Sequence, residues 1–225
     1  MSEAQRVDPR ADDELRAVDG RVPGRRGLAT RQRLLDRTRE MLATSSYRDL
    51  KVIDIAREAG TSPATFYQYF SDVEAAILVL SEEVAAQAAH LTKVVAEGSW
   101  KGRNGYQTAV DLVDAFLAFW EEHRPLLRVV ELATEEGDPR FERIRVRLLN
   151  DVTGALAQVA ESAKADGRLP ADLDATAAAA VLVSMVTYVA AHPHGFGLWG
   201  LDAEALRGAL ARQVAWGVTG TRPTG

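Results

Sequence analysis

Residues 61–70, with the sequence TSPATFYQYF, combine hydroxyl and amide side chains with several aromatic rings. Phe66 and Phe70 are four residues apart, so in a helix they lie on one face and can pack against a core. Tyr67 and Gln68 then point away from that core, where a hydroxyl and an amide can hydrogen-bond to base edges or phosphate oxygens. The segment therefore predicts a short helix with one packing face and one binding face.

The residues that flank this segment predict where the helix begins. Gly60 is suited to the end of a preceding helix, over residues 52–59. Thr61 or Ser62 can cap the next helix, and Pro63 is favoured in its first turn. This order of helix, glycine turn and short helix predicts a helix-turn-helix, whose second helix reads the major groove of DNA with its N-terminal residues.

Charge is distributed unevenly along the 225 residues, which carry a net charge of −5. Residues 21–70 contain ten basic and five acidic side chains and carry +5, whereas residues 1–20 carry −3 and residues 71–225 carry −7. A basic segment in an acidic chain is what a phosphate-binding surface requires, although a solvated basic face has the same composition.

The stretch RQRLLDRTREMLATSSYRDLKVIDIAREAGTSPATFYQYFSDVEAAILVL, residues 31–80, resembles the DNA-binding domain of the TetR family of transcriptional regulators. The resemblance implies a homodimer of nine-helix chains, in which three N-terminal helices bind operator DNA. It implies that the six later helices form a core for ligand binding and dimerisation. It also implies a repressor that a small, largely apolar ligand releases from double-stranded DNA.

The family pattern places base and phosphate contacts at Thr65 and Tyr67, and a phosphate contact at Tyr69. The helix after the segment departs from the pattern, because Val73 replaces a phosphate-binding lysine; its N-terminus can still attract a phosphate. Lys51 replaces a common capping threonine. The side chains expected to contact DNA, including two arginines of the basic arm, are Arg25, Arg26, Lys51, Ser62, Ala64, Thr65, Tyr67, Gln68 and Tyr69.

The rest of the chain shows helical periodicity throughout, which predicts an all-α fold. We expect a flexible arm over residues 1–29, acidic and then basic, a three-helix helix-turn-helix domain over residues 30–75, and a six-helix domain over residues 76–225. The patterns predict one long helix over residues 72–97, separate helices over 107–123 and 125–136, and a loop over 192–200.

Bulky and polar residues of the larger domain are candidates for a ligand pocket, because such pockets are apolar with a few placed polar groups. For each aromatic residue, plain core packing is the competing interpretation. The candidates are Phe116, Phe119, Trp120, His123, Glu131, Phe141 and Tyr188.

The last two helices are candidates for a dimer face, since the helix over residues 172–191 is apolar nearly all round. Two helices from each chain would then form a four-helix bundle, the alternative being burial within one chain. The apolar face of the last helix is expected to carry Leu206, Ala209, Leu210, Val214 and Gly217.

Several functional classes lack the residues they need. The chain has no cysteine, which excludes disulfides and thiolate metal sites and is compatible with the cytoplasm. His192 and His194 have no obvious further ligands, and no GxSxG motif is present, so we expect no metal, cofactor or catalytic site. No apolar run is long enough to cross a membrane. The alternatives left open are a DNA-binding regulator controlled by a protein partner or by no ligand, and an enzyme that uses the larger domain.

Overall fold

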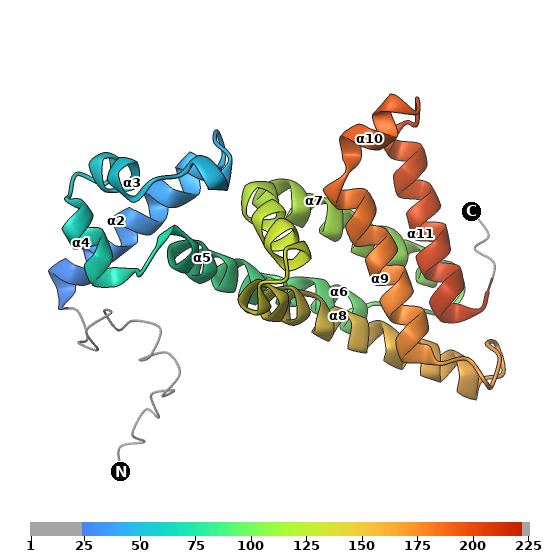
Figure 1. Cartoon of the computed structure of the whole chain (residues 1–225). Helices are drawn as coiled ribbons and strands as arrows, with labels where there is room; N and C mark the ends of the chain where they lie inside the picture. The colour runs from blue at the N-terminus through green and yellow to red at the C-terminus, as the bar shows by residue number, and fades with distance from the viewer. Residues whose placement is uncertain (1–23, 222–225) are drawn as a thin grey trace, which may run out of the picture. The chain divides into compact units, whose positions relative to one another are not determined.

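The computed structural model describes residues 24–221, and in this range every regular element is helical (Figure 1). The predicted all-α class is confirmed. The α-helices are α2 (Arg25–Leu42), α3 (Val52–Glu58), α4 (Pro63–Tyr69), α5 (Val73–Gln87), α6 (Ala89–Glu97), α7 (Gly102–Glu135), α8 (Pro139–Ala165), α9 (Ala175–Ala191), α10 (Pro193–Leu198) and α11 (Ala203–Thr219). The chain divides into two compact units, one up to Glu83 and one from Val84 onward, whereas the sequence placed the boundary at residue 75.

In the first unit, α2, α3 and α4 pack on one another around a small apolar core. Helix α2 begins at Arg25, because Gly24 is extended and its carbonyl accepts the first helical hydrogen bond, from the N–H of Leu28 at 3.0 Å. The expectation that residues 25–29 belong to a flexible arm is therefore wrong. The remainder of that arm, residues 1–23, lies outside the described residues.

In the second unit, α7 runs unbroken through Pro125, where the sequence predicted two helices. Proline removes one backbone hydrogen bond and crowds the preceding turn, which usually kinks or ends a helix. Buried side chains lie on both sides of it, among them Phe119 and Trp120 before and Leu126 and Leu127 after. This continuous burial offsets the local cost of the proline.

The predicted long helix over residues 72–97 is interrupted at Ala88. The N–H of Ala88 lies 3.2 Å from the carbonyl oxygens of both Val84 and Ala85, and the N–H of Leu91 bonds to the Ala88 carbonyl at 2.9 Å. One residue therefore follows a tighter turn and separates α5 from α6. Ala88 is buried, so its packing rather than its intrinsic helix propensity sets the local conformation.

Helices α7, α8, α9 and α11 pack on one another and form most of the second unit, and α9 and α11 lie side by side (Figure 1). Arg207 on α11 donates to both carboxylate oxygens of Asp114 on α7, with Nη2 2.6 Å from Oδ2, and this ion pair ties the last helix to the longest one. The segment after α9, predicted as a loop, contains the short helix α10.

Candidate nucleic-acid interface

The start of α4 is capped as the sequence predicted. Ser62 is the N-cap residue, and its Oγ accepts a hydrogen bond from the N–H of Thr65 at 3.2 Å. The Thr65 hydroxyl lies 3.0 Å from the Ser62 hydroxyl, and Pro63 occupies the first turn. The preceding helix ends at Gly60, which has φ +66°, and the N–H of Thr61 bonds to the Ala56 carbonyl at 2.9 Å. The turn and the cap therefore fix where α4 begins.

Two phenylalanines hold one face of α4 against the rest of the first unit. Phe66 and Phe70 are buried, and their ring centroids are 5.4 Å apart. The guanidinium of Arg31, a buried residue of α2, lies 5.3 Å from the centre of the Phe70 ring. These contacts fix the rotation of α4 about its axis.

The opposite face of α4 is open to solvent. Tyr67 is 52% exposed despite its large ring, and Ala64 and Gln68 are also exposed. Thr65 and Tyr69 are half-buried at the edges of this face. We call Ala64, Thr65, Tyr67, Gln68 and Tyr69 the reading face. It combines a small residue near the helix start with hydroxyl and amide groups farther along, which suits a helix that approaches base edges.

The three predicted basic contacts lie at helix starts. Arg25 and Arg26 are exposed in the first turn of α2, and Lys51 is the exposed N-cap residue of α3. Lys51 makes no side-chain capping bond to its helix. All three cations are therefore available to solvent on the first unit, where phosphates would be their natural partners.

The start of α5 does not suit the phosphate contact that we expected there. Asp72 caps this helix, with Oδ1 accepting from the N–H of Ala75 at 2.7 Å. The carboxylate satisfies an N–H that a phosphate would otherwise bind, and its negative charge repels a phosphate. Val73 is buried and adds no cation. The start of α5 therefore offers a phosphate neither a free N–H at Ala75 nor a cation at position 73.

Four predicted ligand residues lie in the interior of the second unit: Phe116, Phe119, Trp120 and Phe141. The rings of Phe116 and Trp120 stack at 5.6 Å, and Phe119 meets the ring of His123 edge-on at 4.6 Å. Most of this cluster comes from α7, on which the residues recur at spacings of three and four.

Trp120 Nε1 and Thr187 Oγ1 are among the buried polar atoms of the second unit that lack a hydrogen-bond partner. Both residues are buried, and an unsatisfied buried donor costs about 1–3 kcal/mol. Burial raises the pKa of the half-buried Glu131 above its ordinary value, although His192 and Arg145 act to lower it. Such groups are the ones a bound molecule would satisfy.

Tyr188 does not lie with these residues, so its assignment to an interior pocket is wrong. It is 60% exposed, and its ring stacks on His192 at 4.4 Å. The face of an apolar helix that points outward cannot be identified from composition alone, which is why the sequence placed Tyr188 inside.

The described structure exposes an apolar surface along α9 and α11. Val181 is 68% exposed and Trp216 is 48% exposed. Together with Ala177 and Gln213 they border a groove of about 810 Å³ between the two helices; we call these four residues the α9–α11 face. Gly217 allows the close approach of the helices here, because a Cβ at this position would lie 2.8 Å from Leu182 Cδ1.

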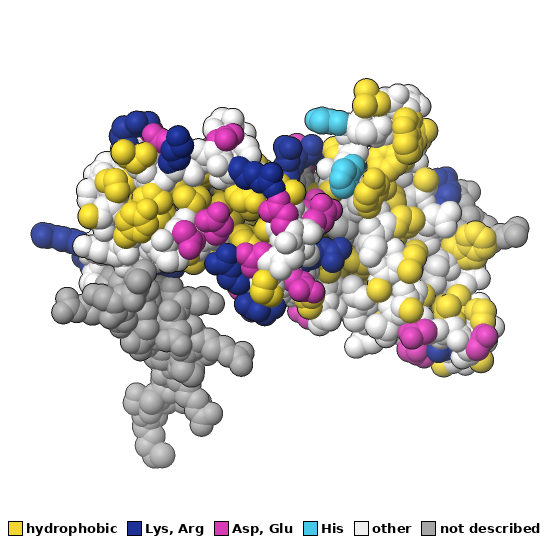
Figure 2. All heavy atoms as spheres, viewed as in Figure 1, with side chains coloured by type: hydrophobic (Ala, Val, Ile, Leu, Met, Phe, Trp, Pro, Cys, Tyr) yellow, Lys and Arg dark blue, Asp and Glu magenta, His cyan; other side chains and the backbone are white. Residues whose placement is uncertain are grey.

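The expected composition of this face is partly wrong. Leu210 and Val214 are buried inside the unit, whereas Ala209 is exposed and Leu206 and Gly217 are half-buried. Sequence reasoning missed Val181 and Trp216, which lie on the same faces as exposed small and polar residues. It also missed Leu198 and Trp199, which are exposed at the end of α10. Figure 2 shows hydrophobic side chains gathered beside the histidines in this region.

Metal-ion clusters and membrane-spanning helices are both absent from the part of the chain that the structure describes. Between residues 24 and 221, no three His, Asp or Glu side chains converge in an arrangement that could hold a metal ion. Over the same residues, no helix is both long and apolar enough to cross a bilayer.

Solved structures share this fold. The fatty acid degradation regulator FadR from Bacillus halodurans is 17% identical, with 87% of this chain and 97% of that chain covered at a TM-score of 0.63. The transcriptional regulator FadR from Bacillus subtilis, in complex with stearoyl-CoA, is 16% identical, with 85% of this chain and 99% of that chain covered at a TM-score of 0.60. A tetR-family transcriptional regulator from Streptomyces coelicolor is 13% identical, with 83% of this chain and 79% of that chain covered at a TM-score of 0.60.

Family models agree with the structural comparison, whereas no curated protein matches the sequence. Residues 34–75 match the model of bacterial regulatory proteins of the tetR family, and residues 91–225 match the model of the tetracyclin repressor-like C-terminal domain. The second match alone covers more than half of the chain. The chain therefore belongs to the TetR family of DNA-binding regulators.

Proposed function

We propose that this regulator is a sequence-specific repressor that binds operator DNA as a homodimer and is released by a small, largely apolar ligand. The observation that carries the DNA-binding part is the build of α4, which is capped by Ser62, anchored by Phe66 and Phe70, and exposed along the reading face. A role on DNA places the protein in the cytoplasm, and the proposal assigns it no catalytic activity.

The reading face would enter the major groove with its N-terminal end first. Ala64 lets the backbone approach the bases closely, and Gln68 can bond to an adenine edge through its amide. Tyr67 can reach a base edge or a phosphate, while Tyr69 lies at the margin of the helix where phosphates pass. Arg25, Arg26 and Lys51 would add contacts to the DNA backbone, which position the protein but do not read sequence.

Tyr67→Ala is expected to weaken operator binding and leave the fold intact. The ring of Tyr67 is half exposed and supports little of the core, so its loss removes a contact to DNA rather than a packing contact. One lost contact costs about 1–3 kcal/mol per half-site, and a dimer loses it twice. The measurement is fluorescence anisotropy on a duplex selected from a random pool by the unaltered protein.

Two further measurements show whether Tyr67 contacts DNA or supports the fold. Tyr67→Phe keeps the ring and removes the hydroxyl, so it shows whether the hydrogen bond or the ring carries the contact. Thermal unfolding of each variant checks that the first unit remains folded. Operator affinity equal to that of the unaltered protein in Tyr67→Ala would show that this face does not read DNA.

The homodimer part of the proposal rests on the α9–α11 face. Solvated apolar side chains such as Val181 and Trp216 are costly to leave exposed next to one another, and a second copy of the chain would cover them. Two copies related by a twofold axis would present two reading faces to a symmetric operator, with half-sites about 34–36 Å apart.

The ligand part rests on the interior cluster around Phe116 and Trp120. The cluster offers apolar surface, and Trp120 Nε1 and Thr187 Oγ1 offer unsatisfied hydrogen-bonding atoms. One relative of the same fold is in complex with stearoyl-CoA, whose acyl chain is apolar. That likeness supports an interior ligand of largely apolar character for this chain, with His123 and Glu131 as the polar groups at its edge.

Ligand and operator are expected to weaken each other by the same factor. A ligand that prefers the shape unable to bind DNA lowers operator affinity, and linkage requires the operator to lower ligand affinity equally. Typical coupling is about 1–3 kcal/mol, or 5–150-fold. Screening acyl compounds would supply a ligand. Calorimetric titration of that ligand with and without saturating operator measures how much the operator weakens ligand binding, and anisotropy with and without ligand measures the converse effect.

A conservative variant tests whether the interior cluster is the ligand site through which this coupling acts. Trp120→Phe removes the unsatisfied N–H and keeps most of the apolar volume, so it should reduce the ligand response and preserve operator affinity. Equal ligand affinities with and without operator would contradict release by a ligand. That result would favour the alternative of a regulator controlled by a protein partner or by no ligand.

A further inference from the structure

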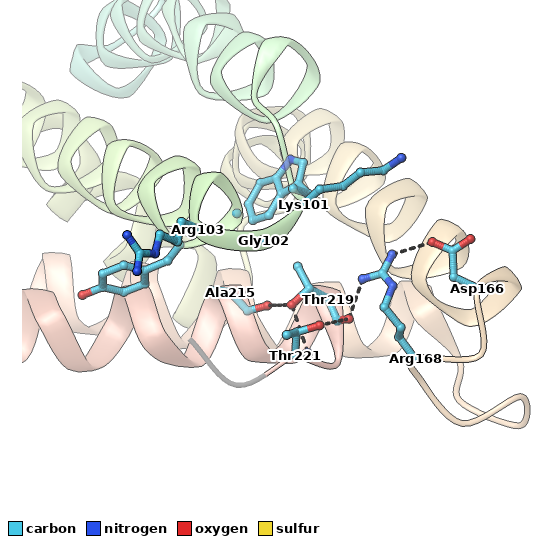
Figure 3. A pocket seen from close by; sticks show the side chains of 11 residues that line it. Lys101, Gly102, Arg103, Asp166, Arg168, Ala215, Thr219 and Thr221 are labelled. Carbon is cyan, nitrogen blue, oxygen red and sulfur yellow. Dashed lines mark hydrogen bonds and ion pairs between the residues drawn. The ribbon is translucent and has the colours of Figure 1, made fainter. Parts of the chain in front are cut away.

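A separate cavity of about 570 Å³ lies at the start of α7 (Figure 3), and none of its lining residues belongs to the interior cluster. Its walls come from three parts of the second unit: the loop and first turn of α7, the turn after α8, and the end of α11. The lining residues are Trp100, Lys101, Gly102, Arg103, Gly105, Tyr106, Asp166, Arg168, Ala215, Thr219 and Thr221. Its volume falls within the range of about 300–1,000 Å³ that is usual for small-molecule sites.

Hydrogen bonds and close packing hold the aromatic wall of the cavity in place. Trp100 Nε1 donates to the Val95 carbonyl at 3.0 Å, and the Thr108 hydroxyl donates to the Ser99 carbonyl at 3.0 Å. Gly105 lies directly against this loop, because a Cβ there would come within 3.0 Å of the Trp100 backbone. The wall is therefore formed before any ligand arrives, which lowers the entropic cost of binding.

On the opposite wall, Arg168 connects the turn after α8 to the end of α11. Its Nη1 donates to the Thr219 carbonyl at 2.7 Å, and its Nη2 donates to Asp166 Oδ2 at 2.8 Å, as the dashed lines in Figure 3 show. The hydrogen bond from Arg168 lowers the pKa of Asp166 below its ordinary value, so this carboxylate stays ionised and paired. Asp166 therefore pairs with Arg168, and its charge also acts, more weakly, on Lys101.

Two cations of the cavity have no such partner. Neither Lys101 nor Arg103 has a hydrogen bond or close ion pair with any described residue, although Lys101 feels the charge of Asp166, and both are exposed where α7 begins. Figure 3 shows Lys101 extending toward the side on which Asp166 lies and Arg103 lying on the other side. Arg212, which is not a lining residue, lies 5.6 Å from the ring centre of Tyr106. Three cations, Lys101, Arg103 and Arg168, line the cavity against one carboxylate, so its net charge is positive and attracts anions although the protein carries −5.

We infer that this cavity binds a small organic anion with a flat apolar body, such as an aromatic carboxylate. The rings of Trp100 and Tyr106 would contact the body, and Lys101 or Arg103 would pair with the carboxylate. The site is distinct from the interior cluster proposed for the releasing ligand, and it does not depend on the proposed function.

The test uses the full chain, without DNA, and two probes of similar shape. Isothermal titration calorimetry compares 2-naphthoate, which is an anion, with the neutral 2-naphthylmethanol. We expect saturable binding of 2-naphthoate at one site per chain and weaker binding of the alcohol. Lys101→Met combined with Arg103→Met should weaken 2-naphthoate by about tenfold or more, because charge-assisted hydrogen bonds are lost. The same pair should leave the alcohol unchanged.

A matched control is available on the same helix. Arg128 is exposed on α7 and does not line the cavity, so Arg128→Met removes a charge without changing the site and should bind 2-naphthoate as the unaltered chain does. Absence of 2-naphthoate binding, equal affinity for both probes, or unchanged affinity in the double variant would each overturn the inference. Because no DNA is present, none of these results bears on operator binding.

Discussion

Phe66→Ala is expected to lower the free energy of unfolding of the DNA-binding unit by about 3–5 kcal/mol, the usual cost of removing a buried aromatic ring. Phe66 has no exposed surface and contacts the ring of Phe70, so the truncation leaves a cavity at the centre of a small core. Small units have little stability to spare, and operator binding should be lost with the fold. Urea denaturation followed by circular dichroism measures the change as an early transition of this unit.

Two controls show whether the loss comes from the cavity. Phe66→Leu keeps more of the buried volume and should cost less than the alanine variant. Ile53→Ala truncates an exposed side chain of α3 and should change stability by no more than about 0.5 kcal/mol. A stable first unit in Phe66→Ala would show that α4 is held by other contacts.

Val181→Asp is expected to convert the proposed dimer to monomers and thereby abolish high-affinity operator binding. An unpaired carboxylate buried at an interface costs about 3–5 kcal/mol, and a symmetric dimer would bury two of them. The monomer should remain folded, because Val181 is largely exposed within one chain. Sedimentation equilibrium gives the mass in solution, and anisotropy gives the operator affinity.

Val146→Asp is the matched control, since Val146 on α8 has a similar exposure, 57%, outside the α9–α11 face. It should leave the dimer and its operator affinity unchanged. If Val181→Asp sedimented as the unaltered protein does, the dimer would use another surface, or the chain would act alone.

The DNA-binding unit was predictable because its signals are local. Gly60, Ser62 and Pro63 each favour one backbone conformation at one position, and the spacing of Phe66 and Phe70 defines a packing face without reference to the rest of the chain. Helix boundaries set by tertiary packing were not predictable. Pro125 favours a break, yet buried neighbours keep α7 continuous, and Ala88 favours a helix, yet lies at an interruption.

The surfaces of the second unit were harder to predict for a related reason. Helices α9 and α11 carry apolar residues on several faces, and only their packing decides which of these are buried. Leu210 and Val214 are inside the unit, whereas Val181 and Trp216 are exposed. The cavity at the start of α7 combines residues more than 100 positions apart, from Trp100 to Thr221. The periodicity of a single helix does not indicate which distant residues lie together in the folded chain.

The exposure of Trp216 gives the protein an optical signal for self-association. Indole emission shifts to shorter wavelengths when water is excluded from the ring, so a partner chain that covered Trp216 would change its spectrum. Trp120 is already buried, whereas Trp199 is itself exposed, so a Trp199→Phe variant would leave Trp216 as the exposed indole whose emission shifts. The colour of the emitted light, followed as the protein is diluted, would therefore report the fraction of paired chains without any added label.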